Sequence, residues 1–263
     1  MAIFAISEAD LVAGDEDLVA LLKQASAAQL APLVEALTGH ASTRFKMRPA
    51  IRRQLLGAHE RQHYNHDDVV VMVHALEHFG GNTLANAYRR KGVAYRDIVL
   101  AVLKRLDLKD VDTQADIATL ELRVLENMVE DGFQSMDVPA RKALLRRLGV
   151  KDENGQAGLK SLKAYLKSGK LNPRHLPDIV SSQIIPQFRK HVLPLAKSTA
   201  PRLLHASRYL RSPYVAVPAA VAGAGALAYR LTLENYRVMI PCVVQIARIR
   251  QAAADKSAVP VPE

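Results

Sequence analysis

Hydrophobic residues recur along much of this chain at intervals of three and four, the spacing that places them on one face of an α-helix. Such stripes predict helices over residues 18–22, 30–37, 69–79, 95–106, 116–130, 139–149 and 176–197. The alternating apolar and polar pattern that is typical of β-strands does not recur between them. The pattern therefore predicts an all-α fold, a multi-helix bundle.

Residues that start and stop helices stand beside these stripes. Capping side chains precede four of them: Ser26 with Gln29, Asn65 with Asp68, Thr113 with Asp116, and Asp137. Such side chains accept hydrogen bonds from the free N–H groups of a first helical turn. The basic segment 43–57 is expected to form a helix broken at Pro49, because proline removes a backbone donor. Gly80 and Gly81 are expected to end the helix that reaches Phe79.

The distribution of these signals divides the chain into five segments. They are a small N-terminal helical module (1–40), a helical body (41–150), a linker with a basic helix (151–170), a basic region with a C-terminal apolar hairpin (171–254) and a disordered tail (255–263). Cys242 is the single cysteine, so no disulfide can form within the chain, and this suits a reducing compartment. The first residues lack the basic segment of a secretory signal, and we expect a cytoplasmic protein.

The expected hairpin lies between Arg211 and Arg250. Eighteen residues between Arg211 and Arg230 carry no charge, and a second uncharged run extends from Val238 to Ala247. A membrane-spanning helix needs about 20 predominantly apolar residues, and the first run is short and rich in alanine. Two apolar helices of this kind can lie in a membrane interface, insert as a shallow hairpin, or pack inside a soluble bundle.

Arginines surround both uncharged runs, and they are Arg208, Arg211, Arg230, Arg237, Arg248 and Arg250. Basic residues in such positions suit an anionic headgroup layer. Gly223 and Gly225 lie in an alanine-rich run and offer a surface on which another helix can pack closely. We therefore expect the hairpin to contact an anionic membrane with these arginines at its rim. The alternative is a hairpin buried in a large helical core.

The net charge of +10 is unevenly distributed along the chain. Residues 171–263 contain twelve Lys and Arg against four Asp and Glu, whereas residues 1–170 contain 24 against 22. A basic protein can also bind nucleic acid, but the sequence has no aromatic RNA-binding strand motif, zinc knuckle or helix-turn-helix signature. The coincidence of positive charge with apolar runs favours an anionic membrane as the partner.

One candidate chemical motif lies in the helix over residues 69–79. His74, Glu77 and His78 match the H-x-x-E-H pattern, in which two histidines bind zinc and the glutamate polarises a water molecule. A third ligand is not recognisable, and one histidine at the end of an apolar helix can simply interact with the helix dipole. We therefore predict no metal and no cofactor. A zinc-dependent hydrolase is kept as an alternative.

The block His78-Phe79-Gly80-Gly81-Asn82-Thr83-Leu84-Ala85-Asn86 resembles the bacterial YaaW-like family. The likeness continues in Lys104–Lys109 and Tyr236–Pro241, and residues 30–38 resemble the short helical module that often precedes this domain. Sequence classifications group this family with ubiquinol-cytochrome c chaperone proteins, which assist assembly of a membrane respiratory complex. The resemblance thus implies a helical, membrane-linked binding protein and supplies no catalytic residues.

Together these features predict a non-enzymatic protein of the chaperone or assembly type, bound peripherally to the inner membrane and acting on an unidentified protein partner. The contact face for that partner is expected at the corner between two helices, which is formed by His78, Phe79, Gly80, Gly81, Asn82 and Asn86. Self-association into a homo-oligomer stays open. A membrane-inserting effector or toxin is the main alternative function.

Overall fold

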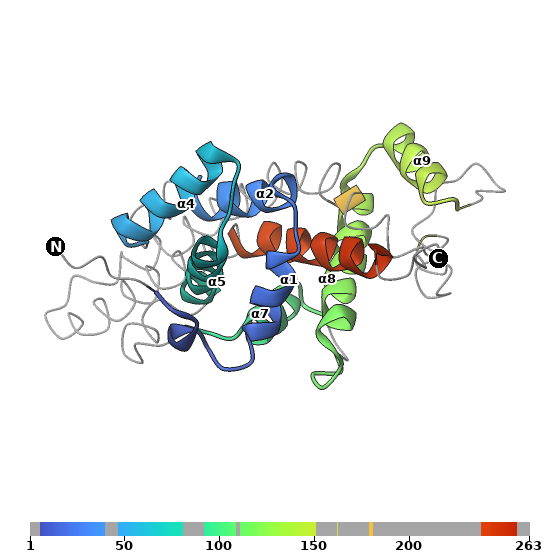
Figure 1. The fold of residues 1–263 in the computed structure, drawn as a ribbon. Coiled ribbons are helices and arrows are strands. Elements are labelled where there is room, and N and C mark those ends of the chain that lie inside the picture. The colour runs from blue at the N-terminus through green and yellow to red at the C-terminus, as the bar shows by residue number, and fades with distance from the viewer. Residues whose placement is uncertain are drawn as a thin grey trace, which may run out of the picture.

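The computed structural model describes residues 6–39, 47–80, 92–108, 111–150, 162, 179–180 and 238–256. Within these ranges the chain is helical and contains no strand, which confirms the predicted all-α multi-helix bundle (Figure 1). The elements are η1 (Glu8–Asp10), α1 (Glu16–Lys23), α2 (Ala27–Thr38), α4 (Pro49–Arg61), α5 (His66–Gly80), α7 (Tyr95–Arg105), α8 (Ile117–Ser135) and α9 (Val138–Arg147), followed by a helix over residues 238–256.

Three of the predicted helix starts are confirmed by hydrogen bonds in the first turn. Ser26 precedes α2 and exchanges contacts with Gln29, whose side-chain oxygen accepts from the Ser26 N–H at 2.9 Å. Asn65 and Asp68 bond reciprocally at the start of α5. Asp137 caps α9 by accepting from the Ala140 N–H at 2.9 Å. These contacts reach only three residues along the chain and could therefore be predicted locally.

Two predicted helix boundaries differ from the structure. Asp116, and not Thr113, is the N-cap of α8, because its carboxylate accepts from the Thr119 N–H. Proline at position 49 does not break a helix but begins α4, which continues to Arg61. A proline in the first turn loses no helical hydrogen bond, since the N–H groups there have no helical acceptor.

α5 lies at the centre of the N-terminal half of the fold, where α1, α2, α4 and α7 pack against it (Figure 1). The residues that its neighbours cover are Val69, Val70, Val71, Met72, Val73, Ala75, Leu76 and Phe79. A helix that is apolar around most of its circumference must be covered on several sides. Accordingly, α1 and α2 share one continuous hydrophobic core with α4 and α5.

The helix over residues 238–256, red in Figure 1, begins near α5 and runs past α8, where Arg250 contacts Glu121. Its buried residues are Val238, Met239, Ile240, Cys242, Val243, Val244, Gln245, Ile246, Ala247 and Ile249. The run Val238–Ala247, expected to form half of a lipid-contacting hairpin, is therefore packed in the protein core instead. The first run, with Gly223 and Gly225, lies outside the described residues. Among the helices that the structure describes, none has the length and apolarity to cross a membrane.

Gly92 fixes how closely the chain entering α7 approaches α5. The Val93 N–H donates to the carbonyl oxygen of Glu77 at 3.1 Å. A Cβ atom at Gly92 would lie 2.5 Å from the Cβ of Glu77 and 3.3 Å from its carbonyl carbon. Because no real Cβ approaches another carbon so closely, α7 and α5 would have to separate for a larger residue to fit.

We expect Gly92→Ala to lower the free energy of unfolding by about 1–3 kcal/mol, the usual cost of overpacking. Gly57→Ala is the matched control, because the nearest atom to its added Cβ is the flexible tip of Arg61 at 3.2 Å. This change inside α4 is expected to stabilise by up to about 1 kcal/mol through helix propensity. Urea denaturation of both variants tests the pair, and equal stabilities would contradict the close approach at Gly92.

Candidate functional site

Two buried carboxyl groups meet where the chain before α1 crosses α5. The Glu77 side chain is fully buried, with 0% of its surface exposed, and its Oε1 accepts from the Val12 N–H at 2.9 Å. Asp15 precedes α1, but its carboxylate caps α7 instead, accepting from the Tyr95 N–H at 3.1 and 2.9 Å. The pair thereby joins three segments that are distant in the sequence.

The electrostatics of this pair indicate that it holds one proton. Burial, followed by the neighbouring Asp15 carboxylate, raises the pKa of Glu77 to about 8. Burial also raises the pKa of Asp15, although the Tyr95 N–H opposes this shift by stabilising the charged form. The Oε2 atom of Glu77 is buried and receives no hydrogen bond. A proton on Glu77 lets this carboxyl donate to Asp15, so that two buried negative charges never face each other.

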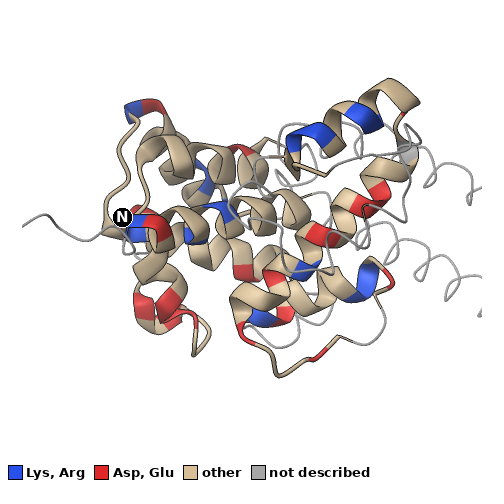
Figure 2. Ribbon diagram, turned by 90° about the vertical axis from the view of Figure 1, so that its right-hand side faces the viewer, with Lys and Arg blue, Asp and Glu red and all other residues tan. Residues whose placement is uncertain are grey.

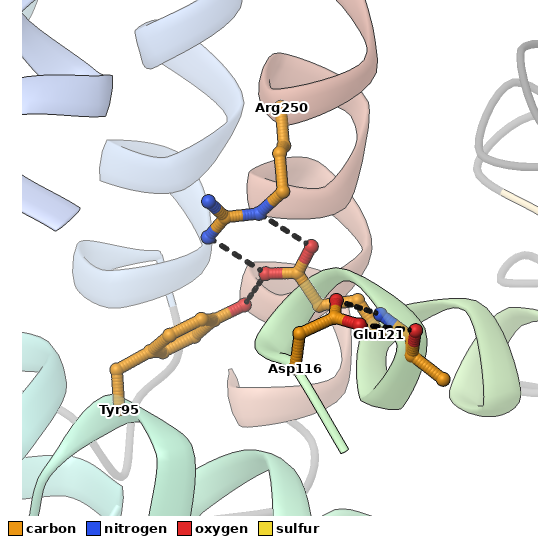
Figure 3. A network of polar contacts seen from close by, with 5 residues as sticks. Tyr95, Asp116, Glu121 and Arg250 are labelled. Atoms are coloured by element: carbon orange, nitrogen blue, oxygen red, sulfur yellow. Dashed lines mark hydrogen bonds and ion pairs between the residues drawn. The ribbon is translucent and has the colours of Figure 1, made fainter. Parts of the chain in front are cut away.

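A second buried network joins α7, α8 and the helix over residues 238–256 (Figure 3). The Tyr95 hydroxyl donates to Oε1 of Glu121 at 2.9 Å. Arg250 donates from Nε to Oε2 of Glu121 at 3.0 Å and from its NH2 group to Oε1 at 3.2 Å. This two-point contact matches the planar guanidinium to the planar carboxylate. The hydroxyl of Tyr95 and the guanidinium of Arg250 thus both donate to the carboxylate of Glu121.

Burial and pairing act in opposite directions on Glu121. Its side chain is 2% exposed, whereas that of Arg250 is 24% exposed. Burial raises the pKa of Glu121, and the hydrogen bonds and charge of Arg250 oppose that rise. Burial and the adjacent Glu121 raise the pKa of Tyr95 well above its usual value. Tyr95 therefore keeps its proton and serves as a donor, and the network holds helices together without a group free for proton transfer.

The two histidines of the H-x-x-E-H motif stack on each other. Their ring centroids are 4.0 Å apart, and a ring nitrogen of His78 lies 2.9 Å from the carbonyl oxygen of His74. Burial, and then the charge of His78, lower the pKa of His74 to about 4, so this ring is neutral near pH 7. The Glu77 side chain accepts from the Val12 N–H and is buried, so it is not presented to a bound water molecule. Within the described ranges no three metal-ligating side chains cluster.

A shallow groove of about 280 Å³ lies between the start of α2, the end of α1 and the helix over residues 238–256. Small and apolar side chains form much of its wall, together with two glutamines and one cation: Leu21, Gln24, Ala25, Gln29, Ile249, Ala252, Ala253 and Lys256. The wall offers no carboxylate or histidine for acid–base chemistry. A groove of this composition can accept an apolar side chain of a partner segment.

The structure places only some of the residues predicted to contact a partner or a membrane. His78, Phe79 and Gly80 end α5, and Phe79 is buried. Arg248 is exposed, whereas Arg250 lies against Glu121 and does not stand at an open rim. The other predicted site residues lie outside the described residues, and they are Gly81, Asn82, Asn86, Arg208, Arg211, Gly223, Gly225, Arg230 and Arg237.

Comparison with known proteins gives the chain a family. It is 30% identical to the UPF0174 protein YaaW of Escherichia coli O157:H7 over 234 residues, which cover 88% of this chain and 92% of that protein. The chain belongs to the UPF0174 family. It is also 25% identical to a UPF0174 protein of Helicobacter pylori strain J99, over 76% of this chain and 98% of that protein. No family model and no solved structure matches.

Membership in UPF0174 confirms the resemblance to YaaW, and the names of these relatives state no activity. Sequence reasoning missed three residues of the two buried networks, namely Asp15, Tyr95 and Glu121. For Glu121 a signal exists, because it lies between Leu120 and Val124 on the apolar stripe of α8. A lone carboxylate on such a stripe is buried with a partner. No local pattern identifies that partner as Arg250.

The shared proton makes the stability of this UPF0174 protein depend on pH. The pKa of Glu77 rises from 4.5 to about 8 on folding, so stability falls as pH increases across this range and levels off above it. In Glu77→Gln the amide donates permanently to Asp15 while its oxygen still accepts from Val12. We expect this variant to lose the slope and to exceed the wild type by roughly 2–5 kcal/mol near pH 9.

Chemical denaturation at about pH 5, 7 and 9 measures this difference. Glu60→Gln removes a carboxylate from an exposed position on α4 and serves as the control, which retains the slope of the wild type. Parallel stability profiles for wild type and Glu77→Gln would show that the two carboxyls do not share a proton.

The second network predicts a large loss when its cation is removed. Arg250→Met leaves Glu121 charged and buried, and we expect a loss of about 2–4 kcal/mol near pH 7. The double variant Arg250→Met with Glu121→Gln removes that charge and keeps an acceptor for the Tyr95 hydroxyl. It should recover most of the loss in a double-mutant cycle. Additive losses in the cycle would mean that the pair is not coupled.

Proposed function

We propose that this protein is a membrane-associated binding protein of the chaperone or assembly type, which docks on an anionic surface of the inner membrane and presents its helices to a protein partner. The observation that carries the binding role is the engagement of its buried acidic groups. Asp15, Glu77 and Glu121 all hold helices together through hydrogen bonds. Carboxyl groups whose hydrogen bonds are made within the protein support a role as a stable scaffold more than a role in catalysis.

The groove beside the helix over residues 238–256 supports a protein partner, because small apolar side chains line much of it. The positive excess of residues 171–263, and the uncharged stretch between Arg211 and Arg230, support a membrane surface. The proposed kinship with ubiquinol-cytochrome c chaperone proteins, which act at a membrane complex, agrees with both parts. In this proposal the buried helix over residues 238–256 stabilises the scaffold and takes no part in lipid contact.

Flotation with lipid vesicles tests the membrane part. We expect the purified protein to float with vesicles that contain phosphatidylglycerol and not with vesicles of phosphatidylcholine alone. Added salt should release it, because screening weakens attraction between exposed charges. A protein that floats with neither kind of vesicle would refute membrane docking. Release of an encapsulated dye would instead identify a membrane-inserting effector, since peripheral docking leaves the bilayer intact.

Protein crosslinking in the native host tests the partner part. The expected result is a defined crosslinked protein in the membrane fraction. The protein could instead float with membranes from a cell extract and yet form no crosslink to another protein. This result would contradict an assembly role and leave membrane docking in place.

A further inference from the structure

α9 carries a row of positively charged side chains that pair with no other residue in the described part of the chain. Its exposed positions follow two adjacent rows at intervals of four residues, and they are Val138, Pro139, Lys142, Ala143, Arg146 and Arg147. The side chains of Lys142, Arg146 and Arg147 form no ion pair or hydrogen bond with any described residue. Figure 2 shows the Lys and Arg positions of α9 in blue on the helix at the upper right, while red acidic positions lie on neighbouring helices.

The opposite side of α9 packs against the rest of the protein. Leu144, Leu145 and Leu148 are buried in the core. Arg141 turns back to donate to the carbonyl oxygens of Phe133 at 3.0 Å and Gln134 at 2.9 Å, near the end of α8. The cationic side chains therefore project from a helix whose other side is held in the core, so that anion binding orders side chains and need not order the helix backbone.

The composition of this face favours lipid over nucleic acid. Val138 is 58% exposed and is the one large hydrophobic residue that stands exposed in the described part of the chain. It lies one turn before Lys142, so an apolar group borders the cations, as in surfaces that reach the boundary of headgroups and acyl chains. The face has no aromatic residue for base stacking and no amide or hydroxyl side chain for base edges.

We propose that the α9 face, defined by Val138, Lys142, Arg146 and Arg147, is a surface that contacts anionic lipid headgroups. This inference rests on the proposed membrane docking and adds α9 to the basic residues 171–263 as a part of the protein that makes the contact. The three cations attract the phosphates of the bilayer, and Val138 enters the headgroup layer beside them. The buried leucines stay in the protein core throughout, so docking needs no unfolding of α9.

The test compares two triple variants that remove the same charge. Lys142→Gln, Arg146→Gln and Arg147→Gln together should weaken binding to phosphatidylglycerol vesicles by roughly tenfold or more, since each basic residue near such a surface contributes a factor of about five. Lys23→Gln, Arg53→Gln and Lys104→Gln remove three exposed cations from α1, α4 and α7. This control should bind within about twofold of the wild type.

A gain of binding provides an independent measurement. Ala143→Arg adds a cation to the same exposed face and should tighten vesicle binding several-fold, and Val138→Ser should weaken it modestly. If the wild type floats with vesicles, and both triple variants and Ala143→Arg bind equally well, the assignment to α9 is overturned. Membrane docking itself would stand. A wild type that ignores vesicles but binds duplex DNA or RNA through the α9 cations would overturn both.

Discussion

The fold depends on a single constraint: carboxyl groups buried among apolar helices must each be matched by a proton or a cation. Two solutions occur side by side. Burial and the nearby Asp15 raise the pKa of Glu77 to about 8, which favours its protonated form near pH 7, whereas Glu121 accepts hydrogen bonds from Arg250 and from the Tyr95 hydroxyl. Tyr95 belongs to both, because its N–H donates to Asp15 and its hydroxyl donates to Glu121. The first turn of α7 therefore connects the acidic pair at α1 and α5 to the ion pair at α8.

These contacts determine which helices lie together and in which register. The bond from Tyr95 to Asp15 spans 80 residues of sequence, and that from Arg250 to Glu121 spans 129. A helix that slipped by one turn would keep most of its apolar contacts but would leave a buried charge without its partner. The polar networks thus select one arrangement from several that the apolar stripes alone would allow. Gly92 contributes to the same selection by letting the chain touch α5 at Glu77.

The sequence predicts what is local in this structure and misses what is distant. Capping by Ser26 with Gln29 and by Asp137 could be recognised, because donor and acceptor are three residues apart. The uncharged run Val238–Ala247 identified a helix but not its surroundings, since a protein core and a bilayer both exclude charge. Arg250 shows the same limit. Beside an apolar run it suggests a membrane rim, and only the folded chain brings Glu121 to it.

α9 shows how tertiary contacts separate residues that look alike in the sequence. Arg141 and Lys142 are neighbours, yet Arg141 is used at the end of α8 while Lys142 faces outward. Lys142 and Arg146 lie four residues apart on one row, where like charges destabilise a helix by about 0.2–0.5 kcal/mol. Among the described residues, no acidic side chain forms an ion pair with this row. A negatively charged surface outside the protein would relieve this repulsion. The exposed side chain of Val138, at the end of the row, could then contact the apolar layer of a membrane.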